Sequence, residues 1–168
     1  MANIDDIDRR EDVAFLLFRY ADEIEGTTRL QKLLFLIEHE SEFSNLYEDI
    51  TFEFESYHYG PFSEGAFDAL EFLISLGAIE EIESDEDYDY IRDSEDRSNH
   101  AGKKFVITEK GRKISQELDA VLDPETKEDL ETLVEKYNDL ELDDLLEYVY
   151  EQYPEYTDKS KIKEDVLG

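Results

Sequence analysis

Negative charge limits what this chain can fold into more than any other feature of its sequence. The 168 residues include 47 acidic and 17 basic side chains, which gives a formal net charge of −30. Such an excess keeps a protein soluble but destabilises its compact state through self-repulsion. Concentrated salt removes most of that repulsion, because the Debye length falls to about 3 Å at 1 M. The composition therefore predicts a protein from the cytoplasm of a salt-accumulating halophile.

Intrinsic disorder and mimicry of nucleic acid would also produce a strongly acidic chain, but both agree less well with the sequence. Hydrophobic residues make up 40% of the chain and aromatic residues 12%, which is enough apolar material for a core and disfavours disorder of the whole chain. A mimic of nucleic acid would gather its carboxylates into one stripe, whereas the acidic residues here lie in every segment. The halophilic interpretation is therefore preferred to both.

The absence of cysteine and of long apolar runs narrows the classes of protein further. Without cysteine the chain has neither disulfides nor thiolate metal sites nor a cysteine nucleophile. No apolar run is long enough to cross a bilayer, and the first residues lack the pattern of a signal peptide. We therefore expect an intracellular, cytoplasmic protein that does not enter a membrane.

The first third of the chain predicts two helices. Apolar residues between positions 11 and 25 recur at three- and four-residue steps, and Gly26 can end this first helix in the left-handed conformation. Residues 28–31 form a capping box that opens a second helix. The tight junction between the two helices indicates the beginning of a helix-turn-helix. The apolar stripe of the second helix consists of Leu30, Leu33, Leu34 and Ile37.

The period then changes to that of a strand. Apolar and polar residues alternate over positions 50–57, and a turn follows at residues 58–62. Ser63 can cap a third helix that ends at Gly77. The buried face of that helix is expected to use Phe67, Leu70, Phe72, Leu73 and Ile74.

The remaining elements complete a winged-helix order. Residues 78–82 and 104–108 predict the two strands of a β-hairpin, and Thr108 can cap a fourth helix. Pro124 opens a fifth helix, and a sixth ends before Pro154. We therefore expect a mainly helical α+β fold: a winged-helix-like domain over residues 1–122, with three helices, a hairpin wing and a helix, and a C-terminal helical extension over residues 123–168 packed on it.

Three stretches of the sequence carry a family resemblance. They are Thr28-Arg29-Leu30-Gln31-Lys32-Leu33-Leu34, Tyr57-His58-Tyr59-Gly60-Pro61-Phe62-Ser63 and Phe105-Val106-Ile107-Thr108-Glu109-Lys110-Gly111-Arg112. Together they resemble the YwgA-like proteins of bacteria and archaea and, more distantly, the Panacea (SocA-type) antitoxin domain. A tail from Leu145 to Tyr156 resembles the same group. The resemblance implies a winged-helix-like fold, and the Panacea domain implies neutralisation of a toxin by protein binding.

The sequence offers little support for an enzyme. Its three histidines, His39, His58 and His100, are far apart, and 47 carboxylates make chance acid pairs unavoidable. There is no glycine-rich phosphate loop and no zinc-binding helix motif. We therefore expect no catalytic residue, no metal and no cofactor, with His58 more consistent with a turn residue than with a ligand.

Positive charge is concentrated in one stretch, residues 97–113, which holds six basic residues and one glutamate. These cations can form a patch that meets phosphates or an acidic partner, or they can neutralise the acidic strand that precedes them in the hairpin. The predicted third helix has Glu64, Asp68 and Glu71 on its outer side and contains no basic residue, which argues against reading of a DNA groove.

Protein binding agrees best with these observations. The leading hypothesis is a non-enzymatic regulatory or interaction module, antitoxin-like or adaptor-like, whose partner is another protein, toxin-like or a second copy of the chain in a dimer. The alternative is a winged-helix transcriptional regulator that binds DNA through its basic wing. The candidate partner-binding residues are Tyr57, His58, Tyr59, Phe62, Lys103, Lys104, Lys110, Arg112 and Lys113.

Overall fold

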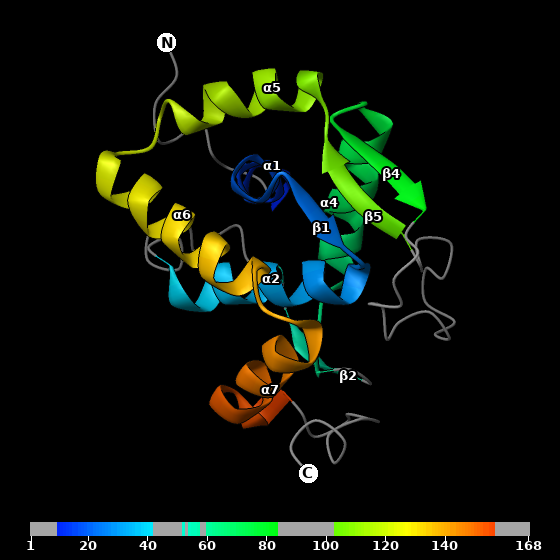
Figure 1. The fold of residues 1–168 in the computed structure, drawn as a ribbon, viewed down its shortest axis with the longest axis vertical. Coiled ribbons are helices and arrows are strands. Elements are labelled where there is room, and N and C mark those ends of the chain that lie inside the picture. The colour runs from blue at the N-terminus through cyan, green and yellow to red at the C-terminus, as the bar shows by residue number, and fades with distance from the viewer. Residues whose placement is uncertain (1–9, 42–51, 53, 58–59, 84–102, 157–168) are drawn as a thin grey trace.

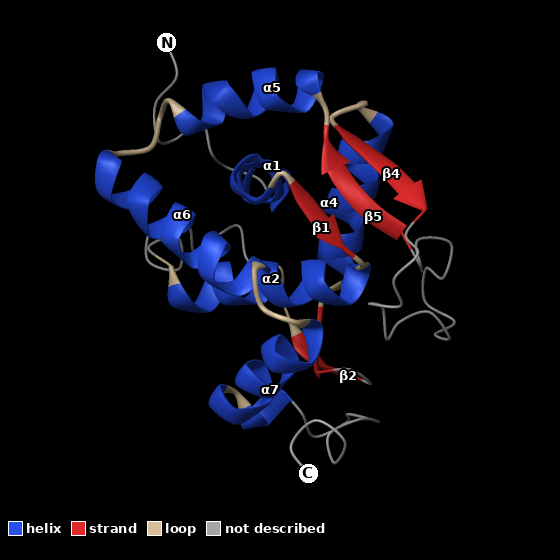
Figure 2. Cartoon of the chain, in the orientation of Figure 1, coloured by secondary structure: helices blue, strands red, loops and turns tan. Residues whose placement is uncertain are grey.

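A computed structural model describes residues 10–41, 52, 54–57, 60–83 and 103–156 (Figure 1). These residues form helices and short strands, which Figure 2 distinguishes by colour. In chain order the elements are α1 (Arg10–Ala21), β1 (Glu23–Glu25), α2 (Thr27–Glu40), β2 (Glu55–Tyr57), β3 (Gly60–Phe62), α4 (Glu64–Ser75), β4 (Ile79–Glu83), β5 (Lys103–Ile107), α5 (Glu109–Asp119), α6 (Pro124–Asn138), α7 (Leu142–Gln152) and the short 3-10 helix η4 (Pro154–Tyr156).

Helix α1 lies at the centre of the fold. Figure 1 shows it end-on, with α5, α6, α2, α4 and the strands arranged around it. Every residue from Val13 to Phe18 is buried, as expected of a helix that is apolar on all sides.

The described strands form two small antiparallel sheets. One has three strands in the order β1-β5-β4, and the other is the β2–β3 hairpin. Ile24 of β1 pairs with Phe105 of β5, and Ile79 of β4 pairs with Ile107. These four side chains are buried, so one face of the three-stranded sheet packs on the helices.

The junction between α1 and α2 differs from the prediction. The first helix ends at Ala21 rather than near residue 25, because Asp22 adopts the left-handed conformation (φ 65°) and the next residues pair with β5 as strand β1. A strand thus separates the two helices that were expected to meet in a tight turn. The prediction of a capping box at residues 28–31 was also wrong: the N-cap of α2 is Gly26, and no side chain makes a capping hydrogen bond there. Here long-range pairing overrides local helix preference.

Several other element ends are confirmed. Ser63 accepts a hydrogen bond from the Ala66 amide at the start of α4, and Gly77 has φ 78° just after its end. Thr108 caps α5, and Pro124 occupies the first turn of α6. One core assignment was wrong, because Phe72 is 36% exposed on α4.

The described residues therefore confirm a mainly helical α+β fold with six α-helices and a three-stranded antiparallel sheet, whereas the winged-helix assignment is not confirmed. Buried residues of α6 and α7, such as Val134 and Leu145, belong to the same hydrophobic cluster as those of α1. Among the described residues, no helix is both long and apolar enough to cross a membrane.

Candidate functional site

Helix α2 holds the β2–β3 hairpin through buried polar side chains. Gln31 is 1% exposed, and its amide bonds Ser63 in both directions: Nε2 donates to the Ser63 carbonyl and Oε1 accepts from the Ser63 amide, each at 2.9 Å. The Ser63 hydroxyl in turn donates to the Phe52 carbonyl and caps α4. The end of the hairpin is therefore fixed to α2 and α4 together.

Two cations of α2 are also buried. Lys32 is 1% exposed, and its Nζ donates to the Pro61 carbonyl at 3.0 Å. Arg29 is 5% exposed and donates to the Asn138 carbonyl at 3.1 Å, near the end of α6. Buried charges are costly unless hydrogen-bonded, so these contacts satisfy groups that would otherwise destabilise the core.

The hairpin contains four of the sequence-predicted binding residues. Tyr57 ends β2, whereas His58 and Tyr59 lie outside the described residues. Phe62 is 6% exposed, and its ring packs 5.6 Å from that of Phe67. Burial makes Phe62 a support of the hairpin, and its predicted contact with a partner remains a prediction.

The five predicted cations mostly have acidic neighbours. Lys103 forms an ion pair with Glu83, the residue opposite it in the β4–β5 ladder. Three further pairs join Lys104 to Glu23, Arg112 to Asp22 and Lys113 to Glu109. Of these four pairs, only Lys103–Glu83 joins the two strands of the β4–β5 hairpin, as self-neutralisation of that hairpin predicts. The other three join β5 to β1, α5 to the residue before β1, and two residues of α5 to each other, and exposed ion pairs contribute little to stability.

The hairpin and Lys110 lie at opposite ends of α4. The hairpin directly precedes α4, whereas the Lys110 side chain lies beside Gly77, just after that helix. The 12 residues of α4 extend about 18 Å at 1.5 Å per residue. The structure thus brings Gln31 and Lys32 to the hairpin, but it does not bring Lys110 there.

A second polar centre, which the sequence reasoning missed, is Glu40 at the end of α2. Its carboxylate accepts hydrogen bonds from the hydroxyls of Tyr137, Tyr148 and Tyr153 at 2.6, 2.7 and 2.6 Å. Burial alone would raise the pKa of Glu40, but the three hydroxyls outweigh it and hold the pKa below its usual value. One carboxylate therefore joins α2 to α6, to α7 and to the residue after α7.

An aromatic cluster surrounds the last two turns of α2. His39 stacks on Phe35 with ring centroids 4.1 Å apart, and its Nδ1 donates to the Phe35 carbonyl at 3.0 Å. Tyr153 and Tyr156 meet the Phe35 ring edge-on, each at 4.9 Å. The clustering of tyrosines near the C-terminus was visible in the sequence, but their common partner on α2 was not.

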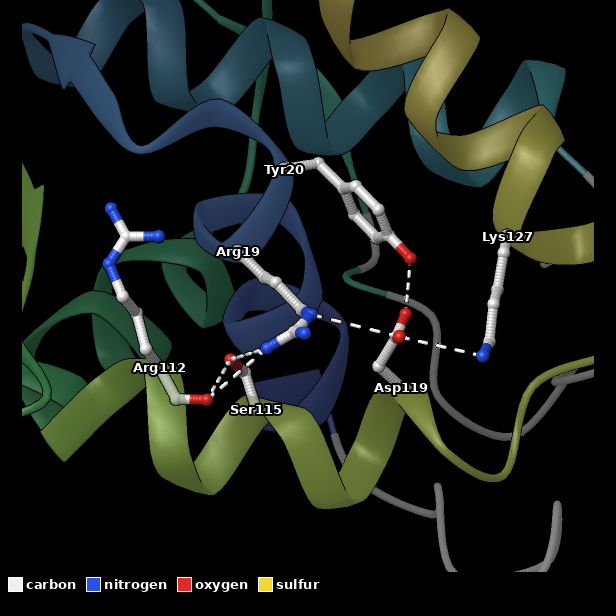
Figure 3. A network of polar contacts seen from close by, with 6 residues as sticks. All are labelled: Arg19, Tyr20, Arg112, Ser115, Asp119 and Lys127. Atoms are coloured by element: carbon white, nitrogen blue, oxygen red, sulfur yellow. Dashed lines mark hydrogen bonds and ion pairs between the residues drawn. The ribbon is translucent and has the colours of Figure 1, made fainter. Parts of the chain in front are cut away.

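Figure 3 shows a third network, centred on Asp119 at the end of α5. Asp119 accepts a hydrogen bond from the Tyr20 hydroxyl and lies 3.8 Å from Arg19 and 3.6 Å from Lys127. Burial, and then the hydrogen bond to Asp119, raise the pKa of Tyr20. The network holds α5 against α1, and its tyrosine stays protonated, so we assign it a structural role.

Two grooves lie beside the end of α6. Both are open, with volumes of about 240 and about 370 Å³, and they share Ala21 and Asn138. The smaller lies between β1 and the end of α6, and the larger between the ends of α1 and α6. Carboxylates dominate the charged residues that line them: Glu23, Glu25, Glu135, Asp139 and Glu141. Over the described part of the chain, no group of three His, Asp or Glu side chains is placed to hold a metal.

The fold and its buried motif define a small helical domain that keeps a hairpin in place. Comparison with protein families adds that residues 30–154 match the family model of the antitoxin SocA-like Panacea domain, well over half of the chain. The chain therefore belongs to the Panacea family, which confirms the more distant of the two resemblances in its motifs; the resemblance to YwgA-like proteins stays a prediction. No curated protein and no solved structure matches the chain.

Proposed function

We propose that this protein acts by binding another protein, as an antitoxin-like module that neutralises a toxin without catalysing a reaction. Membership of the Panacea family carries this proposal. The chemistry of the site supports it, because the motif residues Gln31 and Lys32 hold the backbone of a hairpin rather than forming a reactive group. A pre-organised surface element favours binding, since less conformational entropy is lost on association.

The charge of the chain limits how the partner is held. With a net charge of −30, a basic toxin would be attracted in dilute buffer, but molar salt screens charges beyond about 3 Å. Affinity in brine must therefore come from apolar contact and hydrogen bonds at short range. In the predicted surface at residues 57–63, Phe62 is buried, and Tyr57 and Tyr59 are the aromatic residues proposed for the interface centre.

Coexpression tests this proposal. The protein encoded by the neighbouring gene would be expressed alone and with this chain, and cell growth and complex size would be measured at 2 M KCl. We expect the chain to relieve the growth defect and to elute with its partner at a fixed stoichiometry. Growth inhibition that persists despite soluble expression of both proteins would contradict the proposal.

A DNA-binding assay distinguishes protein binding from the alternative function, a transcriptional regulator that binds DNA. A regulator that uses its basic flank would bind a specific duplex at molar KCl and lose that binding in the variant Lys103→Glu, Lys104→Glu, Arg112→Glu. We expect no specific duplex to bind, because these cations already pair with carboxylates. In addition, molar salt removes most of the affinity that counterion release supplies. Specific binding that the triple variant abolishes would replace protein binding as the preferred function.

A further inference from the structure

We propose that residues 153–156, here called the strap, are a releasable cover over an aromatic docking site on α2, and that a tyrosine-bearing segment of the partner protein takes the strap's place. The inference rests on the proposed function, because it names where the partner binds and which side chains it presents. The docking site consists of Phe35, His39 and Glu40, with Phe54 beside them.

The strap covers the docking site with two tyrosine rings. Tyr153 lies perpendicular to Phe35 (90°) and Tyr156 nearly so (76°), which is a favourable edge-to-face arrangement. The same two rings lie 5.5 and 5.8 Å from His39. Phe35 has no exposed surface in this arrangement. Removal of the strap would therefore uncover a large aromatic side chain, the kind of residue that dominates binding at interface centres.

The polar edge of the site specifies a hydroxyl. The Tyr153 hydroxyl donates to Glu40 Oε2 at 2.6 Å while its ring contacts Phe35. A segment that replaces the strap must therefore offer an aromatic ring that ends in a hydrogen-bond donor, and tyrosine meets both requirements.

The strap is held less firmly than the helix before it. Leu145, Leu146, Val149 and Tyr150 of α7 have no exposed surface, whereas η4 contains no buried residue. Of the strap's residues, Pro154 and Glu155 are exposed and the two tyrosines are half-buried. Local opening is easiest where the least burial is lost, and detachment of the strap exposes two half-buried rings whereas detachment of α7 exposes four fully buried side chains, so the strap can open first.

The position of the strap links it to the hairpin. Helix η4 packs against β2, and β2 belongs to the hairpin that Gln31 and Lys32 fix to α2. A partner that contacts the hairpin therefore reaches the strap as well. Displacement of the strap and recognition of the hairpin become parts of one binding event.

A peptide experiment on the full chain tests the cover. The probe is the tetrapeptide acetyl-Tyr-Pro-Glu-Tyr-amide, which copies the strap, and the readout is the NMR signals of the His39 ring at 2 M KCl. These signals are readily assigned because the chain has three histidines. We expect the peptide to shift them saturably in the variant Tyr153→Ala, Tyr156→Ala, with at least tenfold weaker binding to the wild type, where the strap competes. A control variant with the same substitutions elsewhere in the sequence, Tyr88→Ala and Tyr90→Ala, should bind as weakly as the wild type.

The chemical specificity of the site is tested with a second peptide. Replacement of both tyrosines by phenylalanine removes the donor for Glu40, and we expect about tenfold weaker binding to the strap variant, which corresponds to about 1.4 kcal/mol. Unchanged affinity would contradict the role assigned to Glu40.

Three results would overturn the proposal that the strap is a releasable cover. Loss of the helical circular dichroism of the strap variant would show that the strap belongs to the core. Absence of a His39 shift in a folded variant would show that no docking site is uncovered. Equal binding to variant and wild type would show that the strap does not compete. None of these results depends on a toxin, so failure of the coexpression test would overturn the proposed function and leave the cover standing.

Discussion

Replacement of Gln31 by methionine tests whether the α2–hairpin contact determines the stability of this fold. Methionine is close in size to glutamine and helix-compatible, so the Gln31→Met variant removes the two hydrogen bonds to Ser63 with little change in packing. The site is 1% exposed, and water therefore does not replace the lost partner.

The size of the expected destabilisation follows from the Ser63 groups that lose their hydrogen-bond partner. The Ser63 amide becomes a buried, unsatisfied donor, which costs about 1–3 kcal/mol, and loss of the second bond adds about 1 kcal/mol. We therefore expect the free energy of unfolding to fall by about 3 kcal/mol. With a urea m-value of about 2 kcal/mol/M, the midpoint should move down by about 1.5 M.

Urea denaturation at 2 M KCl, followed by circular dichroism, measures this change without altering the ionic strength. Gln116→Met is the matched control, because Gln116 is exposed on α5 and a surface change should stay within about 0.5 kcal/mol. If Gln31→Met and its control unfold at the same urea concentration, the hydrogen bonds to Ser63 do not stabilise the fold and the argument from buried polar groups fails.

Three further predictions concern packing, salt and pH. Gly111→Ala should lower the free energy of unfolding by about 3 kcal/mol in the same assay, because a Cβ there would lie 2.2 Å from the Ala78 carbonyl oxygen. The urea midpoint of the wild type should rise from 0.1 to 2 M KCl, since a charge of −30 repels itself in dilute buffer; an unchanged midpoint would refute the halophilic interpretation. Glu40→Gln should destabilise the protein by about 2 kcal/mol at pH 7. The folded-state pKa of Glu40 is lowered, so its stabilisation is present above the ordinary glutamate pKa and is lost as the pH falls; a deficit that stays constant from pH 7 to pH 3.5 would contradict the assignment.

The sequence predicted those parts of the fold that depend on local chemistry. Ser63 and Thr108 were placed correctly as helix caps, because a cap needs one side chain and one nearby amide. The family followed from short motifs for a related reason. One motif residue, Gln31, bonds the backbone of another, Ser63, so the motifs mark a contact on which the fold is built.

The parts that were missed depend on contacts between distant segments. Strand β1 exists because Ile24 pairs with Phe105, which is 81 positions away, and nothing local distinguishes residues 23–25 from the end of a helix. The candidate site shows the same limit. Glu40 is one of 47 acidic residues, and its role is set by three tyrosines about a hundred positions later.

In brine, the contacts that can fix a unique structure are the buried ones. Exposed pairs such as Lys113–Glu109 contribute little even in dilute buffer and less at molar salt, so the many surface charges confer solubility more than structure. Gln31 and Lys32 act at nearly full burial, where salt does not reach. Their hydrogen bonds hold the β2–β3 hairpin in one position on α2. That position determines where the strap contacts the hairpin and where the proposed partner would bind. On the halophilic interpretation, the large negative charge adapts this protein to its solvent, while a few buried polar groups fix the position of the proposed binding surface.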